Sequence, residues 1–131
     1  MVPAAPDARI LDVAHLHRQT FGDRALEREV LALFEQQCLR LPPLIAAGKN
    51  PNESADAAHT LKGAARAVGA WRLALLAEAL ETALGEGRPA ETLERLNRAL
   101  EQAVAAVRGA VAELRSARGP WPPDLSPIRD A

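Results

Sequence analysis

The stretch Ala58–Trp71, AHTLKGAARAVGAW, has the spacing of a helix but contains a histidine, two basic residues and two glycines, which weaken helices. Leu61 and Val68 lie seven residues apart, which puts them on the same face of an α-helix. Upstream, the sequence Asn50-Pro51 is a helix start signal, since Asn is a good N-cap and Pro suits the first helical position. Gly69 is a natural terminator. We therefore predict a helix over residues 51–68.

His59 stands on the opposite side of this predicted helix from its apolar face. At about 100° per residue, Leu61 and Val68 lie roughly 200° and 180° from it. If those two residues face the core, His59 faces solvent. The alternatives are an ordinary surface histidine and a functional one.

Gly63 and Lys62 distinguish between these alternatives. Glycine inside a helix costs about 1 kcal/mol relative to alanine. It lies one turn beyond His59, and helical side chains lean toward the N-terminus, so a larger residue there would cover the imidazole. Lys62 and Arg66, three and seven residues after His59, add positive charge on the same face. An accessible imidazole, open space and nearby cations suit an incoming phosphoryl group.

The rest of the chain predicts more helices and no strands. A short helix should begin near Ile10, and a long one should follow over residues 23–48 with Asp23 as its N-cap. Further helices are expected over residues 70–85 or 70–87, and from Pro89 to about Ala117. The long helix over 23–48 should bury a stripe made of Leu26, Val30, Leu33, Phe34, Leu41 and Ile45. Its Pro42-Pro43 pair should kink or split it.

Short connections between these helices predict an all-α, antiparallel up-and-down four-helix bundle with a short extra N-terminal helix. We expect a flexible N-terminus at residues 1–9, the bundle at residues 10–117, and a Pro-rich tail at residues 118–131. Trp121 lies in that tail, and the sequence does not indicate where it would dock.

Composition excludes several classes of function. The chain has 131 residues, 16 of them basic and 17 acidic, and the formal net charge is −1. This balance, without a basic stripe, predicts no nucleic-acid binding. The sequence shows no long apolar run and no secretory signal, so we expect no membrane association and a cytoplasmic location. Cys38 is the single cysteine, which rules out an intramolecular disulfide and suits a buried position.

The motif residues His59, Leu61, Lys62 and Gly63, followed by Gly69, resemble the histidine-containing phosphotransfer (HPt) domain family. The family motif is H-x-L-K-G with a further glycine six positions later. The similarity extends more loosely from Ile10 to about Leu114. The Pro42-Pro43 pair and the tail depart from the family pattern.

This resemblance implies a four-helix bundle that relays a phosphoryl group between aspartates of response-regulator receiver domains. His59 would be the acceptor, Lys62 would assist with charge, and Gly63 would give access. Mg²⁺ would belong to the receiver, so we expect no cofactor or metal in this chain. The resemblance allows a receiver that is a separate protein or one that is part of a hybrid histidine kinase, and we expect this chain to be a monomer. Further candidate contacts to phosphate or partner are Arg66, Ala55, Ala67 and Phe34, the last of which is also a good core residue.

Three other functions are considered, and the sequence favours them to different degrees. A non-catalytic helical adaptor would keep the bundle and bind receiver or kinase domains without using His59. A histidine kinase core requires an acidic residue after the histidine and a nearby proline, whereas Thr60 follows His59 and no nucleotide-binding motif is present. This chain is therefore expected to have no kinase activity of its own. His15 and His17, two residues apart, would point about 200° apart on a helix, which is poor for joint metal binding.

Overall fold

The computed structural model describes residues 7–116, and these form five α-helices without a strand. The elements are α1 (Val13–Gln19), α2 (Arg24–Ala47), α3 (Pro51–Val68), α4 (Trp71–Gly85) and α5 (Ala90–Ser116). The predicted all-helical fold is confirmed. Most of the proposed N-terminal segment 1–9, the tail 118–131 and Trp121 lie outside the described residues. Between residues 7 and 116, no helix is both long and apolar enough to cross a membrane.

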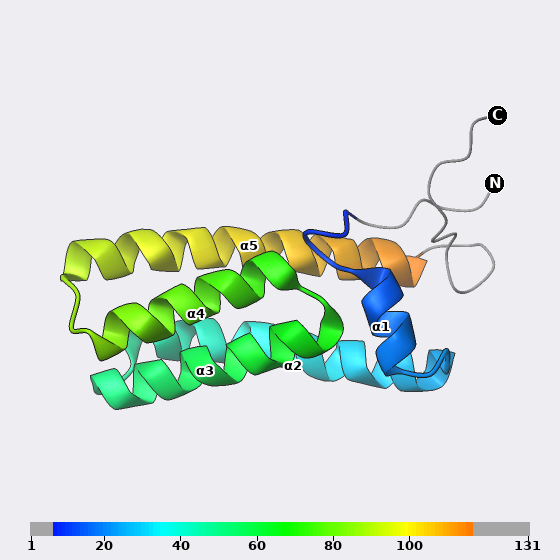
Figure 1. The fold of residues 1–131 in the computed structure, drawn as a ribbon, viewed down its shortest axis with the longest axis horizontal. Coiled ribbons are helices and arrows are strands. Elements are labelled where there is room, and N and C mark those ends of the chain that lie inside the picture. The colour runs from blue at the N-terminus through cyan, green and yellow to red at the C-terminus, as the bar shows by residue number, and fades with distance from the viewer. Residues whose placement is uncertain (1–6, 117–131) are drawn as a thin grey trace.

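The four longer helices pack around one core. Helix α3 packs against α2 and α4, and α5 closes the arrangement by contacting both α4 and α2. Figure 1 shows that α3, α4 and α5 each run back along the helix before them. Helix α1 packs against α3 and lies across the end of the assembly at which α3 gives way to α4 (Figure 1).

Local sequence signals set the boundaries of the motif helix α3. The Asn50 side chain accepts a hydrogen bond from the Glu53 backbone N–H at 2.9 Å, as an N-cap does. Gly69 ends the helix in the left-handed region, with φ of 85°, which side-chain-bearing residues rarely adopt. Asp23 caps α2 in the same way as Asn50 caps α3, by accepting from the backbone of Ala25 and Leu26.

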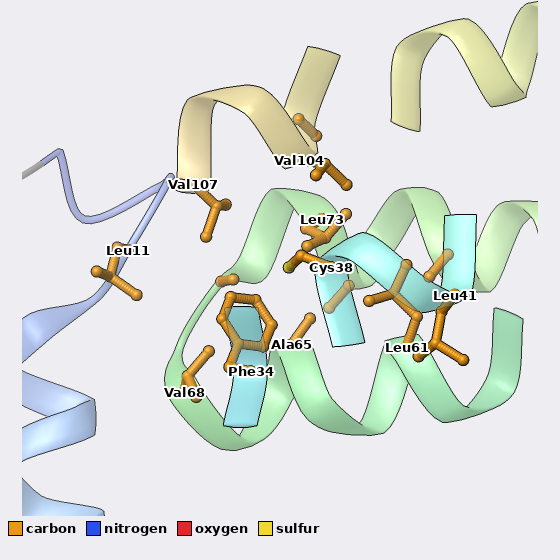
Figure 2. Packing of buried hydrophobic residues seen from close by; sticks show 14 of the residues in the cluster. Leu11, Phe34, Cys38, Leu41, Leu61, Ala65, Val68, Leu73, Val104 and Val107 are labelled. Atoms are coloured by element: carbon orange, nitrogen blue, oxygen red, sulfur yellow. The ribbon is translucent and has the colours of Figure 1, made fainter. Parts of the chain in front are cut away.

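The core is aliphatic and is centred between α2, α3, α4 and α5. Leu61, Ala65 and Val68 of α3 point into it, together with Leu73 and Val107 from the opposing helices (Figure 2). Figure 2 also shows the Phe34 ring within this cluster.

Phe34 is only 2% exposed and packs in the core, and it also lines the floor of the groove between α2 and α3. Its role as a contact for phosphate or a partner stays a prediction. Its place on the buried stripe of α2, which the same spacing predicted, is correct. Burial of a large aromatic ring removes much apolar surface from water and stabilises the fold. Among residues 7–116, Phe34 is the only phenylalanine in the core.

The split of α2 expected at Pro42-Pro43 does not occur. The helix is continuous from Arg24 to Ala47, and both prolines lie inside it. The carbonyls that two prolines leave without an intrahelical N–H belong to Cys38 and Leu39. The packing of Leu41 and Ile45, both 2% exposed, holds this part of the helix against the core on either side of the prolines.

The apolar stripe of α2 is also narrower than the sequence indicates. Leu33 is 62% exposed and Leu26 is 37% exposed, whereas Leu31, Phe34, Cys38 and Leu41 are buried. Leucines at both 31 and 33 cannot face the core together, because they lie about 200° apart on a helix. The exposed Leu33 lines a groove between α2 and α3.

Candidate functional site

His59 lies midway along α3 on the face that points away from the core. Its side chain is 67% exposed, whereas Leu61, two residues later, is fully buried. The predicted orientation of the imidazole toward solvent is confirmed. Because α3 is anchored by buried Leu61, Ala65 and Val68, the position of the backbone beneath the histidine is well defined.

The imidazole is oriented by a carboxylate from the neighbouring helix. His59 Nδ1 lies 2.7 Å from Oε2 of Glu81 on α4. An ionised carboxylate can only accept a hydrogen bond, so Nδ1 is the nitrogen that carries the proton. In the neutral ring, the lone pair then resides on Nε2, and within residues 7–116 that atom has no hydrogen-bond partner. The ring is thus held as the tautomer in which the outer nitrogen carries the lone pair that a nucleophile requires.

Lys62 completes this arrangement. Its Nζ donates to Oε1 of Glu81 at 2.6 Å, so the two carboxylate oxygens are shared between the lysine and the histidine. The Lys62 side chain is mostly buried, at 16% exposure. The hydrogen bond from Lys62 is the largest cause that holds the pKa of Glu81 below its usual value; burial opposes it, and the hydrogen bond from His59 adds a smaller lowering effect. Glu81 is therefore ionised at neutral pH, as the tautomer assignment requires.

Gly63 leaves the space next to His59 open. Apart from its neighbours within α3, no atom lies within 4 Å of the position that a Cβ at residue 63 would occupy. The steric freedom inferred from the sequence is therefore present, since no other element fills the gap that the missing side chain leaves. A reactant can approach the imidazole from this side without displacing protein.

Arg66 is exposed and forms an ion pair with Glu78 of α4, with Nη2 and Oε2 3.1 Å apart. Its guanidinium is thus turned toward α4. Both side chains are about half exposed, so solvent screens the pair and the arginine can exchange partners at little cost. Its assignment as a phosphate contact is a hypothesis that this geometry does not test.

The two alanines named as partner contacts differ in exposure. Ala67 is exposed and lines a shallow groove between α2 and α3, whose other walls include Val30, Leu33 and Ala64. Ala55 is half-buried near the start of α3. The structure therefore places one of them on an apolar surface beside the motif and the other toward the opposite end of the helix.

Helix α1 fixes the C-terminal end of α3. His15 Nε2 lies 3.1 Å from the Arg66 carbonyl oxygen, and the His15 ring packs edge-on against Trp71. The Trp71 indole N–H in turn donates to Asp12 at 3.0 Å. His15 therefore has a packing role, and over residues 7–116 no three His, Cys, Asp or Glu side chains are grouped so as to hold a metal ion.

Sequence reasoning missed Glu81 and Glu78. Both lie on α4, and the motif contains no sign of them. A signal was available in the helical hairpin, because a tight turn at Gly69-Ala70 aligns α3 and α4 in opposite directions. In this hairpin Lys62 pairs with Glu81. Arg66, four residues after Lys62, pairs with Glu78, three residues before Glu81.

Comparison with known proteins agrees with this geometry. A family model described as the Hpt domain matches residues 19–116, from the end of α1 to the end of α5. No curated protein matches the chain.

Proposed function

Since the chain belongs to the Hpt domain family, whose members act in histidine phosphotransfer within two-component phosphorelays, we propose that His59 is the residue that carries the phosphoryl group. The observation that carries this proposal is the exposed imidazole whose Nδ1–H is bound by Glu81, with open space beside Gly63. The scaffold we assign to it is the antiparallel four-helix bundle expected for the family. Hpt domains interact with response-regulator receiver domains, so receiver domains are the class of partner that we propose for this chain.

The reaction at His59 is a phosphoryl transfer between an aspartate and an imidazole. The Nε2 lone pair attacks the phosphorus of a receiver aspartyl phosphate, the bond from phosphorus to the carboxylate oxygen breaks, and the aspartate leaves as a carboxylate. The phosphorylated ring keeps its proton on Nδ1 and gains positive charge, which the Glu81 carboxylate stabilises across 2.7 Å. Attack by the aspartate of a second receiver reverses these steps. The Mg²⁺ that such transfer uses is supplied by the receiver.

Lys62 and Gly63 assist in different ways. Lys62 neutralises Glu81 through their 2.6 Å contact, so an anionic phosphoryl group meets a cluster with a net charge of about zero. Without that ammonium, the approaching phosphate would be repelled by an isolated carboxylate. Gly63 contributes only space, because the leaving aspartate and its surrounding loop must come close to the ring.

We place the receiver on the surface made by α2 and α3 next to His59. The groove between these helices exposes Leu33 and Ala67, and small residues on α3 permit close approach. Exposed apolar area beside a reactive residue suits a transient complex, which needs only a modest interface. Arg66 at the edge of this surface is placed to meet acidic groups of the partner once it leaves Glu78.

Transfer from a phosphorylated receiver domain tests the proposal. Receivers labelled on aspartate by a small phosphodonor are mixed with the chain, and acid-labile label on the chain is mapped to a residue. His59→Gln should abolish labelling while leaving the helical content unchanged. Labelling of that variant at another residue would contradict the assignment. Retention of a biological activity by His59→Gln would instead favour the adaptor.

A profile of transfer rates over a set of receivers would then identify the partners, including any receiver of a hybrid histidine kinase. Sedimentation of the free chain tests the expected monomer. Incubation with labelled ATP alone should leave the chain unlabelled, because the proposed function includes no kinase activity.

A further inference from the structure

A second groove lies far from the motif face, between the start of α2 and the end of α5. Its volume is about 380 Å³. Leu31 and Leu114, both nearly buried, contribute apolar surface, and Ala32 is an exposed residue of its wall. Glu27, only 1% exposed, brings a carboxylate into this apolar surface. The proposed phosphotransfer uses none of these residues.

The chain leaves helix α5 at the edge of this groove. Helix α5 ends at Ser116, immediately after Leu114 and Arg115, which line it. Residues 117–131 follow, with the sequence ARGPWPPDLSPIRDA. The match to the family ends at residue 116, so this segment is an addition to the family core.

We propose that this C-terminal segment occupies the groove, with Trp121 as its anchor. Trp121 lies five residues beyond Ser116, and an extended chain covers roughly 3.3–3.6 Å per residue, so the indole can reach any part of the groove. A docked tryptophan buries roughly 150–250 Å² of largely apolar surface, which matches an apolar site of this size. This inference goes beyond the phosphotransfer function and does not depend on it.

The polar groups of groove and segment are complementary. A buried indole N–H requires an acceptor, and the carboxylate of Glu27, a group that accepts hydrogen bonds, belongs to the groove wall. Arg28 at the groove suits Asp124, three residues after Trp121. Prolines at 120, 122 and 123 restrict the unbound backbone around Trp121, which lowers the entropy lost on docking.

Fluorine NMR of the full chain labelled with 5-fluorotryptophan tests this docking. The chain has two tryptophans, and Trp121→Phe assigns the two signals. We expect the Trp121 signal to show less than half the H₂O-to-D₂O shift of a free peptide spanning residues 117–131. Ala32→Lys places a long charged side chain into the groove and should restore the full shift. Ala46→Lys, at an exposed position on the same helix outside the groove, should leave the signal protected.

Circular dichroism confirms that each variant is folded, and Ala32→Gln repeats the test with a smaller side chain. A Trp121 signal as exposed as that of the peptide would overturn the proposal, as would protection that survives both Ala32 variants. Protection that disappears on dilution would assign the occupant to a second copy of the chain and would equally contradict intramolecular docking. Transfer to His59 should be the same in all these variants, so failure here and failure of the phosphotransfer function are distinguishable.

Discussion

Glu81 of α4 accepts a hydrogen bond from His59 Nδ1 of α3 at 2.7 Å, across the hairpin that joins the two helices. The same carboxylate accepts from Lys62, so one side chain of the neighbouring helix organises both polar residues of the motif. The reactive nitrogen is therefore prepared by a contact that is 22 positions distant in the chain.

Glu81→Gln should slow phosphoryl transfer to His59 without unfolding the protein. An amide can still contact the ring, but it cannot stabilise the positive charge that develops on it. Loss of a carboxylate that orients a metal-binding imidazole costs about 10- to 100-fold in metal affinity or activity. By analogy, we expect at least a tenfold slower transfer from Glu81→Gln.

Glu78→Gln is the matched control, since Glu78 lies on the same helix and binds Arg66 rather than the motif histidine. It should not slow transfer, because the Glu81 carboxylate stays in place and Arg66 is only released toward the partner. Nitrogen-15 NMR of the imidazole gives an independent measurement, in which the proton should be held on Nδ1 in the unmodified chain and shared between both nitrogens in Glu81→Gln. Equal tautomer populations in the two proteins would refute the orienting role.

Gly63→Leu should both raise the thermal stability of the protein and slow phosphoryl transfer to His59. Replacing an exposed helical glycine by leucine favours the helix by up to about 1 kcal/mol, while the new side chain leans over His59. Gly109→Leu on α5 provides the control, because its Cβ would also stand in open space. It should give the stability gain alone. If both variants transferred normally, the open space at residue 63 would have no part in the reaction.

Lys62→Ala should leave the bundle folded and reduce the transfer rate. The ammonium is removed from a carboxylate that it contacts at 2.6 Å, so the phosphoryl group would approach a net negative site. Lys62→Arg, which keeps the charge, should recover part of the rate. The measurement is a time course of phosphohistidine formation at low and moderate salt. A rate for Lys62→Ala equal to that of the unmodified chain would remove lysine from the mechanism.

The helices themselves could be predicted well from the sequence, because their signals are local. Caps at Asp23 and Asn50 and the left-handed Gly69 act within a few residues of the boundaries they set. The exposure of His59 followed from a single periodic pattern. The expected split of α2 and the expected burial of Leu33 were wrong for a common reason, because both depend on which face of the helix tertiary packing selects. Glu81 was missed because its role exists only once α3 and α4 are side by side.

Cys38 should resist alkylation in the folded protein. Its side chain lies in the core at 3% exposure, and burial raises the pKa of the thiol to about 12. Very little thiolate, the reactive form, is then present near neutral pH. Iodoacetamide at about pH 8 should therefore modify the chain only after unfolding in urea, which lowers the pKa toward about 8.5. Fast modification of the native protein, measured by mass spectrometry, would contradict this placement in the core.

Acidification should remove the stabilisation that Glu81 provides. Its pKa is held below the ordinary value of 4.5 in the folded state, chiefly by the hydrogen bond from Lys62. A carboxyl group with a lowered folded pKa stabilises the protein above its unfolded pKa, and this contribution is lost as pH falls through the folded pKa. We therefore expect the difference in unfolding free energy between the unmodified chain and Glu81→Gln to be larger at about pH 5.5 than at about pH 3. Urea titrations followed by circular dichroism measure the two differences. A difference that stays constant between these pH values would show that the carboxylate contributes no pH-dependent stability.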